Sequence, residues 1–300
     1  MLQVPQVKPA RSYDEALERV RAFQAYDDDR ILPQARTVLL DHGARTPLVA
    51  VLLHGFTNHP GQYRNFAPTV FDRGVNIFIP RMPEQGDRDR MTRRLSKLTA
   101  ENLLARASDA VDIACGLGDR VCVAGISSSG LLCAYFGQHR SDIARAIPIS
   151  PVFAILNLPY WLSTVVAHTM LVLPNMFLWW DPRAREQQRP ATAYPQFPTH
   201  ALAQTVRIGE DVYAACKRES FAAKSIVVMT NKNDPAVNND VTGRVVHCWK
   251  ARRPAGIETF EFTDLPRNHD IIDPDNPKAR IDIVYPRLLE GILATPGQAP

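Results

Sequence analysis

The chain has 300 residues and a mass of 33.5 kDa, enough to bury a substantial core in one large domain or two small ones. Hydrophobic residues make up 45% of it and charged residues 22%, which excludes a wholly disordered, collagenous or coiled-coil protein. The net charge is only +4 and no long run of lysine or arginine occurs, so the composition gives no indication of a nucleic-acid partner.

The cysteines and the first residues predict a cytoplasmic protein. The five cysteines are an odd number, lie mostly in apolar segments, and form neither a CxxC pair nor a Cys/His cluster. We therefore expect free, buried thiols in a reducing compartment. No apolar run of signal-peptide length follows a basic start, so no secretory signal is predicted.

Residues 161–180 have the length of a membrane span and contain no Asp, Glu, Lys or Arg. His168, Pro174 and Asn175 lie within them and argue against a span. Peripheral contact of this segment with a membrane or lipid interface stays open as an alternative.

Hydrophobic periodicity predicts strands that alternate with helices. Ser12 begins a capping box ahead of an amphipathic helix. Apolar runs that predict strands occupy residues 36–40, 48–53, 75–80, 121–124, 143–149, 225–230 and 257–262. Further helices are predicted over residues 99–115, 131–136, 240–249 and 281–293. Such alternation indicates an α/β fold with a mostly parallel sheet and helices on both faces.

One long segment interrupts the alternation. Residues 152–224 lie between two predicted strands and are far longer than a simple crossover needs. We interpret them as a cap or lid inserted into a core formed by residues 1–151 and 225–300. The segment is rich in apolar residues, among them Trp161, Met170, Trp179 and Trp180, which would line a pocket or pack against the core.

The strand, turn and helix at residues 121–130 hold the first candidate catalytic residue. Ser127 stands two residues after Gly125, at the point where a strand runs directly into a helix. A serine on so sharp a turn is lifted clear of the sheet, and the helix N-terminus behind it favours developing negative charge. A turn that merely joins the strand to the helix is the alternative.

A nucleophilic serine needs a histidine base and a carboxylate that orients the base. Asp234 comes just after the strand at 225–230, and His269 lies in the loop between the strand at 257–262 and the last helix. The weaker candidates are Asp240 and Asp273 for the acid and His247 and His139 for the base.

The serine turn resembles the nucleophile elbow Gly-x-Ser-x-Gly of the α/β-hydrolase superfamily. Gly125 and Ser127 match it, while Ser129 stands where the second glycine is usual. We interpret Ser129 as a tolerated small residue, since Gly130 follows directly, and leave Ser128 and Ser129 as less favoured nucleophiles.

Further features agree with this resemblance, which covers roughly residues 35–295. The order Ser127, Asp234, His269 is the chain order of that superfamily's catalytic triad. The His-Gly pair after the strand at 48–53 resembles its oxyanion segment, and by that match the N–H groups of Phe56 and Ser128 form the oxyanion hole. Residues 81–87 resemble a loop of monoglyceride-lipase-like hydrolases and carboxylesterases, but Glu84 and Gln85 depart from it, which leaves the subfamily open.

The resemblance implies a serine hydrolase of the α/β-hydrolase fold that cleaves carboxylic esters through an acyl-enzyme intermediate, as a carboxylesterase or lipase. Ser127 would be the nucleophile, His269 the base and Asp234 the acid that orients it. The substrate would be a small-molecule ester or lipid, and no metal or organic cofactor is implied. A thioesterase, an amide hydrolase, a C–C bond hydrolase and a non-catalytic ligand receptor on the same fold remain alternatives.

Overall fold

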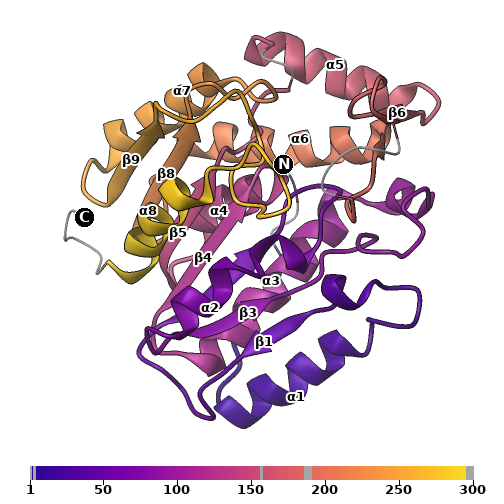
Figure 1. The fold of residues 1–300 in the computed structure, drawn as a ribbon. Helices are drawn as coiled ribbons and strands as arrows, with labels where there is room; N and C mark the ends of the chain where they lie inside the picture. Colours follow the sequence, from indigo (N-terminus) through magenta and orange to yellow (C-terminus); the bar gives the residue numbers. More distant parts are fainter. Residues whose placement is uncertain (1, 3–4, 156–157, 186–190, 295–300) are drawn as a thin grey trace.

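A central sheet of seven strands organises the protein, whose computed structural model describes residues 2, 5–155, 158–185 and 191–294 (Figure 1). The strand order is β1-β3-β2-β4-β5-β8-β9, and β1 alone runs antiparallel to its neighbour. The mostly parallel α/β sheet predicted from the sequence is therefore confirmed. The strands are β1 (Val38–Leu40), β2 (Val49–Leu53), β3 (Asn76–Ile79), β4 (Val121–Ile126), β5 (Ile143–Ile149), β8 (Ser225–Asn231) and β9 (Ile257–Phe262).

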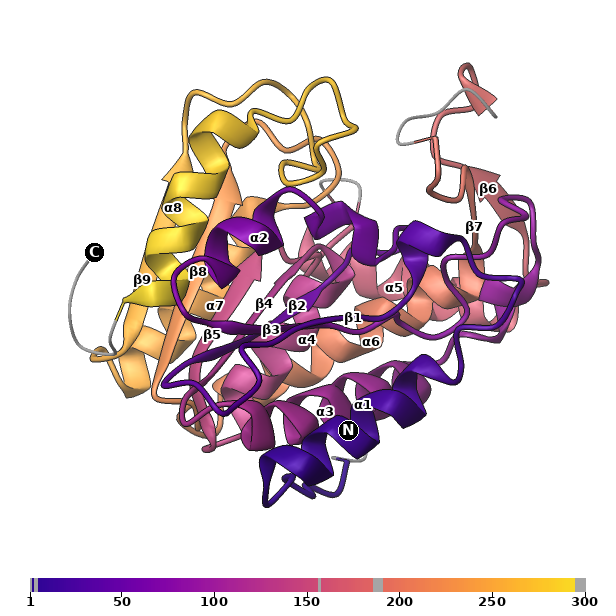
Figure 2. The same cartoon turned by 60° about the horizontal axis from the view of Figure 1, so that its bottom comes forward.

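Helices cover both faces of the sheet (Figure 2). One face carries α1 (Tyr13–Gln24), α3 (Ala100–Leu117), α4 (Ser128–His139), α6 (Thr199–Cys216) and α7 (Asn239–Arg252). The other face carries the short helix α2 (Phe66–Phe71) and the last helix α8 (Ile281–Leu293).

Successive side chains of a strand point to opposite faces of the sheet, and apolar side chains on both faces explain why helices cover both. In β4 the side chains of Val121 and Val123 join the core under the first group of helices, while Cys122 and Ala124 join the core under α2 and α8. All six residues of β4 are buried. Burial on both faces is what makes such a strand a continuous apolar run in the sequence.

The segment between β5 and β8 has an outer and an inner part. The outer part holds α5 (Tyr160–Val172) and a two-stranded hairpin of β6 (Phe177–Trp179) and β7 (Gln196–Pro198). We call the described residues 158–185 and 191–198 the outer segment; its α5 and β6 lie beyond the main layers in Figure 1. The inner part is α6, which packs against α4 closely enough that a Cβ on Gly209 would lie 3.2 Å from Leu131.

The apolar stretch at residues 161–180 forms most of α5 and the strand β6. Helix α5 has 13 residues, and none of the helices in the described ranges is long and apolar enough to cross a membrane.

Candidate active site

Ser127 occupies a strained turn between β4 and α4. Its backbone has φ 62° and ψ −117°, in the region where residues with a Cβ are rare. Its N–H donates a hydrogen bond of 2.9 Å to the carbonyl of Ile149 on the neighbouring strand. A Cβ on Gly125 would lie 2.8 Å from the carbonyl oxygen of Ser129, and one on Gly130 would lie 2.8 Å from that of Ile149. A side chain at either glycine would therefore force the backbone of the turn to shift.

Ser129 has a structural partner that accounts for its presence in the elbow. Its hydroxyl donates to the backbone carbonyl of His54 at the end of β2, and the residue is 1% exposed. Ser127, in contrast, lines the cavity described next. The interpretation of Ser129 as a tolerated residue thus gains a physical reason, because its hydroxyl ties the elbow to the adjacent loop.

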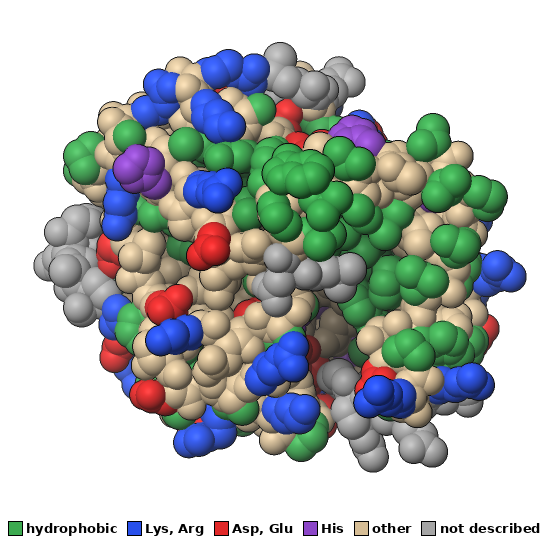
Figure 3. Space-filling model, turned by 90° about the horizontal axis from the view of Figure 1, so that it is seen from above, with side chains coloured by type: hydrophobic (Ala, Val, Ile, Leu, Met, Phe, Trp, Pro, Cys, Tyr) green, Lys and Arg blue, Asp and Glu red, His purple; other side chains and the backbone are tan. Residues whose placement is uncertain are grey.

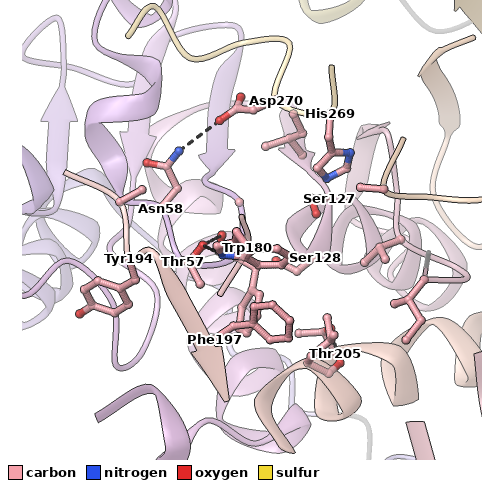
Figure 4. Close-up of a pocket in the computed structure, with 18 of the residues that line it drawn as sticks. Thr57, Asn58, Ser127, Ser128, Trp180, Tyr194, Phe197, Thr205, His269 and Asp270 are labelled. Atoms are coloured by element: carbon pink, nitrogen blue, oxygen red, sulfur yellow. Dashed lines mark hydrogen bonds between the residues drawn. The ribbon is translucent and has the colours of Figure 1, made fainter. Parts of the chain in front are cut away.

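Ser127 and His269 both line a cavity of about 460 Å³ at the carboxyl ends of the central strands. Figure 4 shows the imidazole of His269 beside the hydroxyl of Ser127 at one end of it. Both residues lie in the described part of the chain, and no hydrogen bond joins them in this structure. Such contacts are often long in an unliganded site and tighten only when substrate binds.

Asp234 and His269 form a hydrogen-bonded pair. Nδ1 of His269 donates to Oδ2 of Asp234 at 2.7 Å, and the other oxygen, Oδ1, accepts the N–H of Ala236 at 2.9 Å. Burial alone would lower the pKa of His269, but the charge of Asp234, the hydrogen bond to it and the nearby charge of Asp270 raise that pKa above its ordinary value. This arrangement leaves Nε2 of the imidazole available on the side away from the acid.

The alternative acids and bases lie elsewhere. Asp240 is exposed in the first turn of α7, and Asp273 accepts a hydrogen bond from Asn58. His247 is exposed on α7, and His139 is bonded to Asp211 at 3.1 Å. The structure therefore places Asp234, and neither Asp240 nor Asp273, in contact with His269.

Two backbone N–H groups at the cavity have no partner. Phe56 and Ser128 both line the cavity, and no described residue accepts a hydrogen bond from the N–H of either. The N–H of Thr57, by contrast, donates to Oε1 of Gln85 at 2.7 Å. Unpartnered donors beside a serine that lines the cavity are what stabilisation of an oxyanion requires, and Ser128 in addition opens the helix α4.

His54, which precedes this loop, has a structural role. Its Nε2 accepts the N–H of Met82 at 3.0 Å and its Nδ1 lies 3.0 Å from the carbonyl of Gly55. Burial lowers the pKa of His54 to about 3, so the ring is neutral and can accept at Nε2 while donating at Nδ1.

The other walls of the cavity are apolar. Met170, Trp179 and Trp180 of the outer segment line it, as the sequence analysis expected of this segment, whereas Trp161 lies on α5 with 66% of its surface exposed. Further apolar lining comes from Val152, Leu178, Phe197 and Leu202.

Sequence reasoning missed a polar network between the His269 loop and the loop after β2. Gln62 accepts the N–H of Gly55 at 2.9 Å and donates to Asp270 at 2.8 Å. Asn58 donates to Asp270 at 3.3 Å and to Asp273 at 3.0 Å. Burial, followed by the charge of Asp270, raises the pKa of Asp273 to about 7. Asp270 could have been suspected from its place beside His269, but Asn58 and Gln62 carry no local sequence signal.

Within the described ranges, no group of three or more His, Cys, Asp and Glu side chains could hold a metal ion. The polar groups that line the cavity include the hydroxyl of Ser127, the imidazole of His269, the carboxyl of Asp270 and the side-chain amides of Asn58 and Gln62.

A mostly parallel sheet with a serine on a positive-φ turn, and with an Asp–His pair beyond the later strands, defines the α/β-hydrolase class of proteins. The chain belongs to the alpha/beta hydrolase family, whose sequence profile matches residues 50–283. A curated relative is the thermostable monoacylglycerol lipase of Bacillus sp. (strain H-257), which is 24% identical over 200 residues covering 65% of this chain and 75% of the relative.

Solved structures show the same fold at lower sequence identity. One from the work on the metagenome-derived lipolytic enzymes LipS and LipT has a TM-score of 0.67 and 19% identity, covering 87% of this chain and 98% of that one. A soluble variant of the monoglyceride lipase of Saccharomyces cerevisiae has a TM-score of 0.66 and 13% identity, covering 86% and 90%. The monoacylglycerol lipase of Paleococcus ferrophilus has a TM-score of 0.61 and 15% identity, covering 85% and 99%.

Proposed function

We propose that this alpha/beta hydrolase is a serine hydrolase that cleaves carboxylic esters through an acyl-enzyme intermediate. The observation that carries the proposal is that His269, hydrogen-bonded to Asp234, lines the same cavity as Ser127. Relatives that are monoacylglycerol lipases support an ester as the substrate.

The reaction divides into two steps on these groups. Oγ of Ser127 attacks the ester carbonyl while Nε2 of His269 takes its proton and then passes that proton to the leaving alcohol. A water molecule that gives its proton to His269 then attacks the acyl-serine, and His269 returns that proton to Oγ of Ser127 as the bond to the serine breaks and the carboxylic acid leaves. Asp234 stays ionised and stabilises the imidazolium in both steps.

The N–H groups of Phe56 and Ser128 are the proposed oxyanion hole. In each tetrahedral intermediate the former carbonyl oxygen carries negative charge, which these two donors stabilise. Removal of one such donor in comparable sites costs about 3 kcal/mol in the transition state. Because neither N–H is bonded elsewhere in the described chain, no competing contact has to break first.

The outer segment is the proposed cap. It supplies Met170, Leu178 and Trp179 to the wall that would hold the acyl group, while α6, also within residues 152–224, packs against α4 in the helical layer. An apolar wall opposite a polar serine and histidine favours an ester with an apolar acyl group.

Hydrolysis of nitrophenyl esters with acyl chains of increasing length tests the proposal, with Ser127→Ala as the control. We expect turnover that disappears in the variant, and the chain length at which activity peaks measures how much of the cavity the acyl group fills. If a folded protein hydrolysed none of these esters, the result would contradict ester hydrolysis. It would favour a thioester, amide or C–C bond substrate, or a receptor that binds without turnover.

We further propose that the outer segment contacts a lipid interface. Figure 3 shows hydrophobic side chains gathered on the face seen from above. The exposed ones include Trp161 (66%), Val172 (84%) and Met176 (51%). Leu178 and Trp180 are both exposed and part of the cavity lining, so this apolar surface reaches the cavity and would let a lipid pass from an interface to Ser127.

Co-sedimentation with phosphatidylcholine vesicles tests this contact. The variant Trp161→Ser/Val172→Ser should stay in the supernatant where the wild-type protein pellets, while Tyr26→Ser, an equally exposed aromatic on another element, should pellet normally. Equal pelleting of the first variant and the wild type would exclude the proposed surface.

A further inference from the structure

Thr57 has an unusual backbone for a β-branched residue. It follows Phe56 in the loop after β2, and its φ is 66°, in the left-handed region. Such a conformation is costly for threonine and persists only where surrounding contacts hold it in place. The contacts that hold Thr57 therefore also determine the position of its neighbour Phe56.

All the polar groups of Thr57 are engaged. Its hydroxyl donates to the carbonyl of Phe56 at 2.6 Å and accepts the indole N–H of Trp180 at 3.0 Å. Its carbonyl accepts the N–H of Tyr194 at 2.9 Å, and its own N–H donates to Gln85 at 2.7 Å. Trp180 and Tyr194 both belong to the outer segment, so two of these four contacts come from outside the core.

Ring contacts add to the hydrogen bonds. The ring of Phe56 meets that of Trp180 edge to face, with centroids 6.1 Å apart and an interplanar angle of 86°. Trp180 in turn lies against Phe197, with centroids 4.2 Å apart. Figure 4 shows Trp180 beside Thr57 and above Phe197. The same tryptophan thus contacts the side chain of Phe56 and, through Thr57, its carbonyl.

We propose that Trp180 is a positioning residue that couples the outer segment to the oxyanion loop. By holding the Thr57 hydroxyl, the indole N–H keeps the peptide between Phe56 and Thr57 in place, and with it the direction in which the Phe56 N–H points into the cavity. The outer segment then contributes to the chemical step as well as to the acyl wall. This inference rests on the proposed function, because it assigns the Phe56 N–H to the oxyanion.

The position of Trp180 separates this role from simple packing. Its side chain is 45% exposed, so the hydrogen bond to Thr57 is made by a residue only half covered by the protein. Trp180→Phe retains an aromatic ring next to Phe56 and Phe197 and removes the N–H donor together with one of the two fused rings. Thr57→Val removes the acceptor and keeps the β-branch, whereas Thr57→Ser keeps the hydroxyl.

The rate at which a fluorophosphonate labels Ser127 tests the coupling without needing a known substrate. In this reaction the serine oxygen bonds to phosphorus, fluoride leaves, the serine proton passes to His269, and the phosphoryl oxygen develops charge in the oxyanion hole. We expect Trp180→Phe and Thr57→Val each to slow labelling by about three- to tenfold, the equivalent of one hydrogen bond. The double variant should be no slower than Thr57→Val alone, since that variant has already removed the acceptor of the indole N–H.

The accompanying measurements separate positioning from folding. Thr57→Ser should label faster than Thr57→Val, and ester hydrolysis by Trp180→Phe should show a lowered kcat with KM nearly unchanged. A thermal melt of each variant establishes that the labelled protein is folded; if Thr57→Val does not fold, Trp180→Phe decides alone.

The outcomes distinguish this inference from the proposed function. Labelling of the wild type that persists in Ser127→Ala would overturn the nucleophile, and the coupling with it. Ser127-dependent labelling at the wild-type rate in folded Trp180→Phe would overturn the coupling and leave the proposed function standing. Slower labelling with additive losses in the double variant would also refute it, because the two residues would then act separately.

Discussion

Replacement of Asp234 by asparagine tests the assignment of the acid, because the two oxygens of its carboxylate have different partners. Oδ2 accepts Nδ1 of His269 at 2.7 Å, and Oδ1 accepts the N–H of Ala236 at 2.9 Å. Asparagine has only one oxygen, so it can satisfy one of these donors. If the oxygen stays with Ala236, the amide NH2 faces Nδ1, and the imidazole proton must move to Nε2.

That tautomer cannot take a proton from Ser127, which in a comparable triad lowers kcat by about four orders of magnitude. The opposite amide orientation restores the tautomer but leaves the N–H of Ala236 without its acceptor. An unsatisfied buried donor costs about 1–3 kcal/mol, so even this orientation reduces the active fraction by at least about fivefold. It also leaves the imidazolium without its negative partner. We expect a loss of about a thousandfold or more.

Steady-state hydrolysis of a nitrophenyl ester between pH 5 and 9 provides the measurement. The base must be neutral, and the raised pKa of His269 places the acid limb of kcat/KM in the wild type above pH 6.5, with activity rising as the pH increases. In Asp234→Asn the charge that chiefly raises the pKa of His269 is gone, so the acid limb of kcat/KM should move to lower pH. Asp240→Asn makes the same chemical change on an exposed residue and should keep wild-type activity. A loss of less than fivefold in Asp234→Asn would refute the assignment.

Three further predictions concern the serine turn and the buried acid Asp273. Ser129→Ala leaves the buried carbonyl of His54 without a donor and should lower the free energy of unfolding by about 1–3 kcal/mol in urea denaturation while turnover continues; an inactive but folded variant would contradict the choice of Ser127. Gly125→Ala places a Cβ 2.8 Å from the Ser129 carbonyl and should cost about 1–3 kcal/mol of stability, so an unchanged melting temperature would show that the elbow is looser than described. Asp273, with a folded pKa of about 7 against 3.8, binds its proton more tightly in the folded state, so the wild type should lose up to about 4 kcal/mol of stability as the pH rises from 4 to 7. Asp273→Asn should lose less stability over this range, although burial also raises the pKa of Asp270 and its share remains, and parallel pH profiles of the two proteins would count against the shifted pKa of Asp273.

The central strands β2, β3, β4, β5 and β8 could be predicted because nearly all of their residues are buried, on both faces of the sheet. The run at residues 48–53 and the strand β2 (Val49–Leu53) differ by one residue at the start, and β4 continues two residues beyond the predicted end at 124. That extension arises from long-range pairing, since Gly125 pairs with Leu53 and Ile126 with Ile149. A local pattern cannot reveal such pairing, because glycine alone is a poor indicator of a strand.

The helix and the two strands of the outer segment could not be predicted from the sequence for a related reason. Helix α5 is apolar around most of its circumference, so its residues show no clear helical stripe, and only Ser163 and Ala167 on it are buried. The hairpin strands β6 and β7 have three residues each, too few for alternation to be recognised. Helix α6 does have an amphipathic pattern, but the interpretation of residues 152–224 as one insertion does not distinguish it from the rest of that segment.

The polar residues of the site divide in the same way. Ser127, Asp234 and His269 could be proposed because each follows a strand, and parallel strands bring their carboxyl ends to one edge of the sheet. The hydrogen bonds of Asn58 with Asp270 and of Trp180 with Thr57 could not be predicted, because they join residues far apart in the chain. Nothing in the sequence around either residue indicates a partner.

The division between core and outer segment has a consequence for protein engineering. The serine, histidine and aspartate stand on connections of the central sheet, whereas much of the apolar lining comes from the outer segment, which carries none of the three. Libraries that randomise Met170, Leu178 and Trp179 would therefore vary which molecules fit the cavity while leaving the proposed reacting groups untouched. Under the coupling proposed for Trp180, that single position has to be kept constant. A scaffold arranged in this way can diverge in substrate preference by changes within one short stretch of chain.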